Sequence, residues 1–134
     1  EELDLPVIVH DREAHGDSLA IVKEFPGVRG VFHCYSGSVE MARELVSLGW
    51  MISFTGVLTY PNARKAVEVA QAIPMEALMI ETDAPYMAPV PHRGKRNHSG
   101  LVHQTCQRLA ELKGLTLEET ARITFENGKR FFRI

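Results

Sequence analysis

Three short apolar runs of this chain each lead into a side chain that can bind a metal ion. The runs are residues 7–9 before His10, residues 31–32 before His33, and residues 78–80 before Glu81 and Asp83. Apolar runs this short are typical of buried strands, which places His10, His33 and Asp83 at the C-terminal ends of three strands. (β/α)-barrel enzymes carry their catalytic residues at those ends. The pattern predicts one shared site made of two imidazoles and a carboxylate.

The predicted site favours hydrolytic metal chemistry. Imidazole and carboxylate together suit Zn²⁺, Mn²⁺ or Mg²⁺, and neither Cys34 nor Cys106 stands at a matching strand end. Asp83 is the candidate catalytic residue as well as a metal ligand, because a carboxylate there can accept a proton from a metal-activated water. Two structural interpretations stay open: the histidines can be core residues bonded to nearby backbone, and Asp83 can be a turn acid.

Strand parity adds detail to the predicted site. Side chains alternate between the two faces of a strand, so His10 shares a face with Ile8, His33 with Val31, and Asp83 with Glu81. Val7 and Val9 then face the helices. Glu81 lies deeper in its strand, where an acid more often supports a ligand than binds the metal itself. We also expect Ile52 and Ile80 to lie on the inward face.

Size and composition indicate a single globular domain spanning residues 1–134 without an internal boundary. The chain has 45% hydrophobic and 24% charged residues and a net charge of −2, which argues against an overall basic nucleic-acid binder. A local basic segment remains, in which Arg93, Lys95 and Arg96 are candidates for binding substrate phosphates. The cysteine content predicts a cytoplasmic protein without disulfides, and neither a signal peptide nor a membrane span is expected.

The order of expected elements is strand and helix in alternation. We expect strands over residues 6–10, 28–34, 50–54 and 78–83, and helices over residues 17–25, from Ser38 to Gly49, and from Pro61 to just before Pro74. Two helices follow: one ends at Lys113–Gly114, and one begins with a capping box at Thr116–Glu119 and has Ala121, Phe125, Gly128 and Phe132 on one face. This alternation predicts an α/β fold with parallel strands and right-handed crossovers.

Longer segments of the chain resemble the TatD family of metal-dependent deoxyribonucleases, within the amidohydrolase superfamily. The segments are PVIVHDREA at 6–14, VFHCYSG at 31–37, residues 69–85 ending in ETDAP, PHRGKRN at 91–97 and ENGKRFF at 126–132. The resemblance implies a (β/α)₈ TIM barrel with two divalent metal ions that cleaves phosphodiester bonds of DNA. It also implies that His10 and His33 bind one metal and that Asp83 binds the other and acts as general base. Glu81 and Arg12 are then expected to support the ligands.

Two features of the family pattern are absent from the chain. The family's barrel begins with a His-x-His pair and carries a bridging Glu on its fourth strand, and no two histidines here are spaced that way. We therefore expect the C-terminal half of the barrel, strands five to eight, which would pair with the missing N-terminal half or with a copy of itself. Alternatives are an amidase or lactonase of the same fold, or a non-catalytic half-barrel; the 134-residue chain alone is expected to be inactive.

Overall fold

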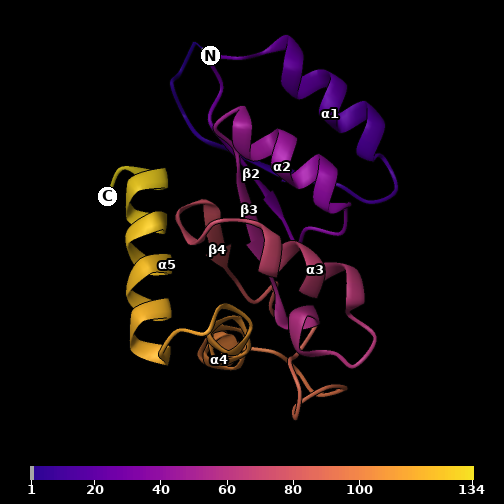
Figure 1. Ribbon diagram of the computed structural model, residues 1–134, viewed down its shortest axis with the longest axis vertical. Coiled ribbons are helices and arrows are strands. Elements are labelled where there is room, and N and C mark those ends of the chain that lie inside the picture. The colour runs from indigo at the N-terminus through magenta and orange to yellow at the C-terminus, as the bar shows by residue number, and fades with distance from the viewer. Residues whose placement is uncertain (1) are drawn as a thin grey trace.

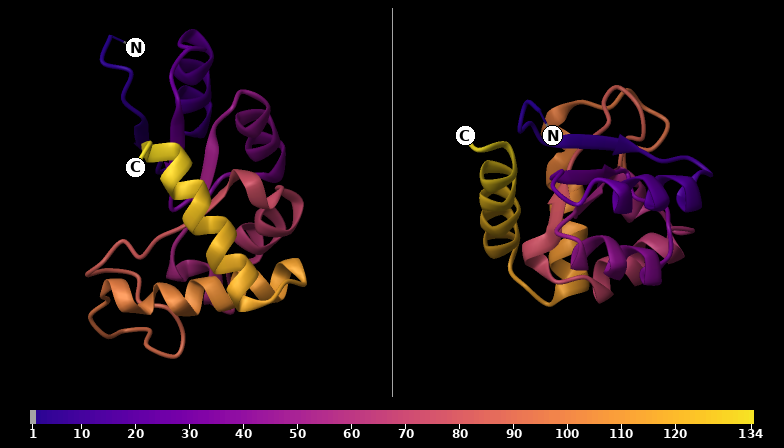
Figure 2. Two further views of the ribbon diagram at one scale, coloured as in Figure 1. Left: turned by 90° about the vertical axis from the view of Figure 1, so that its left-hand side faces the viewer. Right: turned by 90° about the horizontal axis from the view of Figure 1, so that it is seen from above.

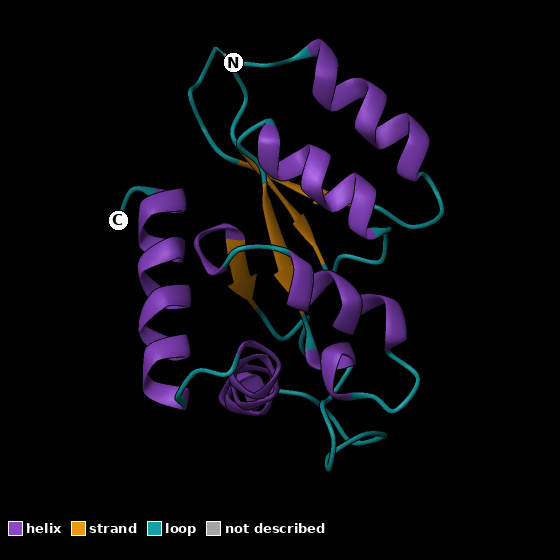
Figure 3. Ribbon diagram, viewed as in Figure 1, coloured by secondary structure: helices purple, strands orange, loops and turns teal. Residues whose placement is uncertain are grey.

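The computed structural model describes residues 2–134, and its centre is one parallel four-stranded sheet (Figure 1). The strands are β1 (Val7–His10), β2 (Gly30–His33), β3 (Met51–Phe54) and β4 (Leu78–Ile80), and they lie side by side in chain order. The helices are α1 (His15–Glu24), α2 (Val39–Ser47), α3 (Arg64–Ala72), α4 (Val102–Lys113) and α5 (Leu117–Phe132), with short 3₁₀ turns η1 (Gly56–Thr59), η2 (Met75–Ala77) and η3 (Ser99–Leu101) (Figure 3). The predicted α/β alternation and parallel pairing are confirmed.

Several helix ends follow directly from local sequence. The Ser38 side chain accepts a hydrogen bond from the Met41 backbone N–H, and both bonds of the capping box between Thr116 and Glu119 are present. Gly114 ends α4 in the left-handed region, with φ of 65°. The expected helix start at Pro61 is wrong. Residues 60–63 form a turn in which the Ala63 N–H donates to the Tyr60 carbonyl at 3.1 Å, and the Ala63 carbonyl accepts from the Val67 N–H, so α3 starts only at Arg64.

One face of the sheet packs on α1, α2 and α3. Figure 1 shows these three helices on one side of the strands and α5 on the other. Val9, Phe32 and Ile52 belong to the larger hydrophobic core on the helix side, and Phe32 and Ile52 have no solvent exposure. The position of Val9 confirms the parity predicted for β1.

The opposite face carries a smaller apolar cluster. Val31 and Met51 pack there with Phe131 from α5, and the partly buried Met79 joins them. The expectation that Ile52 and Ile80 lie on this inward face is wrong. Ile52 pairs with Leu78 in the register of β3 and β4, and Ile80 precedes Glu81 by one residue, so both point to the helix side while Met79 points inward.

Helix α5 buries a polar face and exposes an apolar one. Its buried residues are Thr120, Thr124, Asn127 and Phe131. The stripe expected from the sequence, Ala121, Phe125, Gly128 and Phe132, exists as a face but lines an open groove instead of the core, and the Phe125 side chain is 66% exposed. Figure 2 shows α5 running past the sheet toward the N-terminal segment, where the Arg29 guanidinium donates to the Phe131 carbonyl at 3.0 Å.

The remaining expectations from composition concern thiols and membranes. Cys34 and Cys106 are both free. Burial raises the pKa of both thiols above the ordinary value, so both are held in the neutral form. Among residues 2–134, the helices are all too short or too polar to cross a membrane.

The contact between Gly30 and Trp50 gives a test of this packing. A Cβ at Gly30 would lie 1.9 Å from the Trp50 ring, which in turn packs edge-on against Phe32 with centroids 5.6 Å apart. Gly30→Ala should therefore destabilise the fold by roughly 1–3 kcal/mol. Gly16→Ala in α1 meets no atom within 4 Å and should stabilise the helix by about 0.5–1 kcal/mol. Urea denaturation midpoints measure both changes, and equal midpoints would contradict the packing described.

Candidate metal and catalytic site

The site begins with two histidines at the C-terminal ends of neighbouring strands. His10 ends β1, His33 ends β2, and the parallel register pairs them directly. The Nδ1 atom of His10 lies 3.0 Å from Nε2 of His33. The convergence predicted for these two residues is therefore present in the structure.

The Glu81 carboxylate fixes the orientation of the His33 ring by contacting its Nδ1 atom, whereas His10 contacts Nε2. Its Oε2 lies 3.0 Å from His33 Nδ1, and its Oε1 accepts a 2.8 Å hydrogen bond from the Cys34 backbone N–H. A carboxylate only accepts hydrogen bonds when it is ionised, so in that state the contact with Glu81 places the proton on Nδ1 of His33 and leaves its Nε2, which faces His10, as an acceptor. This is the position expected of an acid that supports a ligand. The Glu81 backbone N–H also donates to the Phe54 carbonyl at 2.9 Å, which holds the residue in line with β4.

Cys34 lies beside this pair but is unsuited to act as a nucleophile. Its sulfur is 3.3 Å from the Thr55 hydroxyl and 3.8 Å from the Met87 sulfur. Burial is the main reason that the pKa of the thiol is raised, and the charges of Glu81 and Asp83 raise it further against the opposing Thr55 contact. A nucleophilic cysteine needs the reverse, a lowered pKa. Asp83 is thus near enough to act on this thiol electrostatically.

Asp83 stands on the same edge of the sheet but outside the hydrogen-bonded cluster. It is partly buried and adopts a left-handed backbone conformation with φ of 54°. Its backbone carbonyl accepts from the Tyr86 N–H at 3.0 Å. Within residues 2–134, no group of three His, Cys, Asp or Glu side chains is arranged to hold a metal ion by itself. The structure thus joins His10, His33 and Glu81 and leaves Asp83 beside them.

The histidine pair fits part of a metal centre. Two imidazole ligands of one zinc ion each lie about 2.0–2.1 Å from the metal, so a tetrahedral arrangement puts their nitrogens roughly 3.3 Å apart. The observed separation of 3.0 Å between His10 and His33 is close to that value. The carboxylate behind His33 is the usual support for such a ligand. The geometry of this pair suits two ligands of one metal ion, and further ligands would be needed to complete a site.

The loop that carries Arg93, Lys95 and Arg96, here called the basic loop, contacts η1 and the adjacent Tyr60. The Arg93 guanidinium carbon lies 4.1 Å from the centroid of the Tyr60 ring, and the Tyr60 hydroxyl donates to the Ala88 carbonyl at 3.0 Å. Thr59 accepts a 2.8 Å hydrogen bond from the Val90 N–H. Lys95 and Arg96 are exposed, and within the described chain neither forms an ion pair.

The structure adds an acid–imidazole pair near the start of α1. Asp11 Oδ2 lies 2.7 Å from His15 Nδ1, and Asp11 Oδ1 accepts from the Ala14 N–H at 3.2 Å. The two residues are four apart in the sequence, but Asp11 precedes α1, so helical spacing did not predict the pair. Arg12 is exposed, and its guanidinium has no hydrogen bond to His10 or His33, so the expected support from Arg12 stays a prediction.

The sequence alone indicated Asn97 only as part of a polar loop and gave no sign of its buried hydrogen bonds. It is 3% exposed, and its side-chain amide donates to the carbonyls of Thr82 and Tyr86, each at 2.7 Å. These carbonyls flank Asp83, so Asn97 connects the basic loop to the candidate catalytic residue. No periodicity marks such a residue, because its partners are backbone atoms of a distant turn.

Comparison with known proteins defines the class to which this site belongs. YabD of Bacillus subtilis, described as an uncharacterized metal-dependent hydrolase, is 46% identical over 136 residues, covering 100% of this chain and 53% of that protein. YcfH of Escherichia coli K12, described in the same words, is 44% identical over 135 residues, covering 99% and 51%. The chain therefore spans about half the length of the curated relatives it matches. These relatives are, by name, metal-dependent hydrolases.

The family follows from the family model and from solved structures. The model described as TatD related DNase matches residues 1–133, and the chain belongs to this family. The crystal structure of YjjV, a TatD homologue from Escherichia coli K12, superimposes with a TM-score of 0.91 at 32% identity, covering 99% of this chain and 52% of YjjV. A TatD family hydrolase from Entamoeba histolytica gives a TM-score of 0.83 at 25% identity, covering 97% and 51%.

Proposed function

We propose that this chain contributes half of the active site of a metal-dependent hydrolase that cleaves phosphodiester bonds of DNA. In this proposal His10 and His33 bind one divalent ion, and Asp83 binds a second ion and acts as general base. The observation that carries it is the position of His33, held between His10 Nδ1 and the Glu81 carboxylate at 3.0 Å on each side. Membership of the TatD related DNase family supports the same function.

The residues of the chain divide the work of such a reaction. A divalent ion such as Mg²⁺, Zn²⁺ or Mn²⁺ would supply Lewis-acid chemistry, which neutralises phosphate charge and makes water a stronger nucleophile. Glu81 keeps the proton on Nδ1 of His33 and so leaves Nε2 free as a ligand. Asp83 would take the proton from the attacking water. Arg93, Lys95 and Arg96 would bind the phosphates that flank the scissile bond.

The basic loop favours DNA over the alternative substrates of an amidase or a lactonase. Amides and lactones carry no charge that would call for three neighbouring cationic side chains, whereas a nucleic-acid strand carries a phosphate at every residue. Arg93 is also kept in place by its 4.1 Å contact with the Tyr60 ring, so its side chain gives up less freedom on binding.

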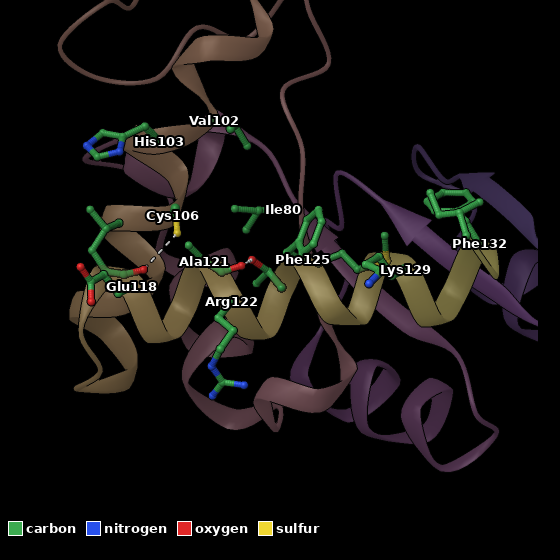
Figure 4. A pocket seen from close by; sticks show the side chains of 15 residues that line it. Ile80, Val102, His103, Cys106, Glu118, Ala121, Arg122, Phe125, Lys129 and Phe132 are labelled. Atoms are coloured by element: carbon green, nitrogen blue, oxygen red, sulfur yellow. Dashed lines mark hydrogen bonds between the residues drawn. The ribbon is translucent and has the colours of Figure 1, made fainter.

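We further propose that the chain forms strands five to eight of a (β/α)₈ barrel and meets the remaining strands along its open edges. The four parallel strands and the half-length match to relatives support this arrangement. An open groove of about 890 Å³ lies beside β4 and is lined by Ile80, Val102, Cys106, Phe125 and Phe132 (Figure 4). Another half of the barrel, or a second copy of this chain, would cover it. The free thiols agree with the cytoplasmic location that we propose.

The full-length gene product tests the proposed reaction. It should release nucleotides from single-stranded DNA when Mg²⁺ or Mn²⁺ is present and stop when the metal is chelated. His33→Ala should abolish detectable turnover, because the variant lacks one metal ligand. Glu81→Gln should weaken metal affinity by about 10- to 100-fold, because the support behind His33 changes. Nucleotide release and calorimetric metal titration measure these effects.

The matched control for these variants is Lys23→Ala in α1, whose side chain pairs with Glu44 of α2 in the helix layer and at which turnover should stay unchanged. Absence of any metal-dependent phosphodiester cleavage in the unmodified full-length protein would contradict the proposal. Cleavage that survives His33→Ala would contradict the proposed role of His10 and His33 as metal ligands.

The basic loop gives an independent test in the same protein. Arg93→Ala and Lys95→Ala should weaken binding to single-stranded DNA and reduce the slope of log affinity against log salt by about 0.7 for each phosphate that the variant no longer neutralises. The fold should stay intact, because both side chains are exposed. Arg108→Ala in α4, where Arg108 pairs with Glu111, is the control. An unchanged salt slope would show that the basic loop is an ordinary solvated surface that does not contact phosphates.

The open edges predict how the 134-residue chain alone behaves. Ile8 is 58% exposed and Phe125 is 66% exposed, and burying each such side chain is worth about 1.5–3 kcal/mol. The isolated chain should therefore self-associate at micromolar concentration, or pair with the other half of the barrel when both are supplied. It should bind metal weakly and show little turnover. A stable monomer in sedimentation, together with cooperative unfolding in urea, would contradict this prediction.

A further inference from the structure

Asn97 donates three hydrogen bonds to the turn after β4, two from its side-chain amide and one from its backbone N–H. Its Nδ2 donates to the Thr82 and Tyr86 carbonyls, both at 2.7 Å. Its Oδ1 accepts from the His98 N–H at 2.9 Å, and its own N–H donates to the Pro85 carbonyl at 3.0 Å. The side chain is 3% exposed, so water does not replace these bonds.

The two carbonyls that Asn97 binds stand on either side of Asp83. Thr82 precedes Asp83 directly, and Tyr86 closes the turn by donating its N–H to the Asp83 carbonyl at 3.0 Å. Asp83 has a φ of 54°, a left-handed conformation that Asp adopts more often than most non-glycine residues but that still carries a cost in free energy. A backbone in that conformation needs external contacts to stay there. The amide of Asn97 supplies them from both ends of the turn.

The chemistry of the position admits few other residues. A single nitrogen must donate two hydrogen bonds to backbone carbonyls while the adjacent oxygen accepts one. Asparagine meets this requirement, whereas an ionised aspartate of the same shape has no donor. Alanine leaves both carbonyls without a partner in a buried place.

We propose that Asn97 is a positioning residue for Asp83, acting through the turn of residues 82–86. This inference rests on the proposed function, because it assigns Asp83 the work of a general base. Loss of the Asn97 amide would let Asp83 leave the left-handed conformation. Its carboxylate would then be misplaced relative to His10 and His33, although substrate binding by the basic loop would persist.

A second buried asparagine provides a matched control. Asn127 in α5 is 2% exposed, and its Nδ2 donates to the Met75 and Leu78 carbonyls, each at 2.7 Å. The two asparagines thus make the same pair of bonds at opposite ends of β4. Removing either amide leaves two carbonyls without a donor, but only Asn97 adjoins the candidate site.

The kinetic test compares Asn97→Ala with Asn127→Ala in the full-length gene product, using single-stranded DNA and Mg²⁺. Both variants should lower the urea midpoint. Only Asn97→Ala should lower kcat, by about 10- to 100-fold, with KM changed less than twofold. Equal kcat losses in the two variants, or a loss confined to KM, would overturn the positioning role.

Amide hydrogen exchange tests the same inference without activity. In Asn97→Ala the amide of Tyr86 should exchange at least tenfold faster, while the same amide in Asn127→Ala should exchange as in the unmodified protein. If Asn97→Ala does not fold, Asn97→Asp, which keeps the shape and the bond to His98, takes its place in both tests. Unchanged exchange at Tyr86 would overturn the proposal. Faster exchange in a protein that shows no phosphodiester cleavage would confirm that Asn97 holds the turn of residues 82–86 and would refute only the proposed function.

Discussion

The parallel register between β1 and β2 is the constraint on which the candidate site depends. It pairs His10 with His33, so two imidazoles from segments 23 residues apart meet at 3.0 Å without any help from loops. Because side chains alternate along a strand, a slip of one residue would turn His10 toward the helices and expose Val9 in its place. The packing of Val9 and Phe32 against the helix-side core therefore fixes the chemistry of the other face.

The remaining strands complete the same geometry. Glu81 follows β4, and the Phe54 carbonyl at the end of β3 accepts from its N–H, so the carboxylate arrives at the level of His33. From that place it binds both the imidazole and the Cys34 N–H, which joins β2 to β4 across the intervening β3. The two histidines and Glu81 are thus supported by regular secondary structure, whereas Asp83, two residues after Glu81, depends on loop contacts.

Much of this arrangement is predictable from the sequence, because it follows from short-range patterns. Apolar runs predicted four strands, and parity placed His10 and His33 on one face. Capping residues such as Ser38 and Thr116 set helix starts correctly. At Pro61 the prediction was wrong: proline suits a first helical position, but residues 60–63 form a separate turn closed by the Ala63 N–H and the Tyr60 carbonyl, and α3 begins only at Arg64.

Two asparagines that the sequence did not single out make long-range contacts with backbone atoms. Asn97 and Asn127 bind carbonyls that lie 11 to 52 residues away in the chain, and only the folded structure brings those partners within reach. The contact of Arg93 with the Tyr60 ring likewise joins distant segments. Residue type alone marked Asn97 and Arg93 as parts of a polar loop and Asn127 as a polar residue of a helix. The sequence therefore indicated the candidate ligands but not the residues that hold them.

Helix α5 shows how a polar face can be the buried one. The hydroxyls of Thr120 and Thr124 each donate to the carbonyl four residues earlier, at 3.0 and 2.9 Å, and Asn127 binds the start of β4, so burial leaves none of these groups unpaired. Satisfied in this way, the polar face can pack against the sheet while the apolar stripe with Phe125 and Phe132 stays uncovered. An amphipathic helix buries its apolar face when a partner surface is at hand. The exposed stripe of α5 is therefore the face that the other half of the barrel, or a second copy of the chain, would cover in the arrangement that we propose.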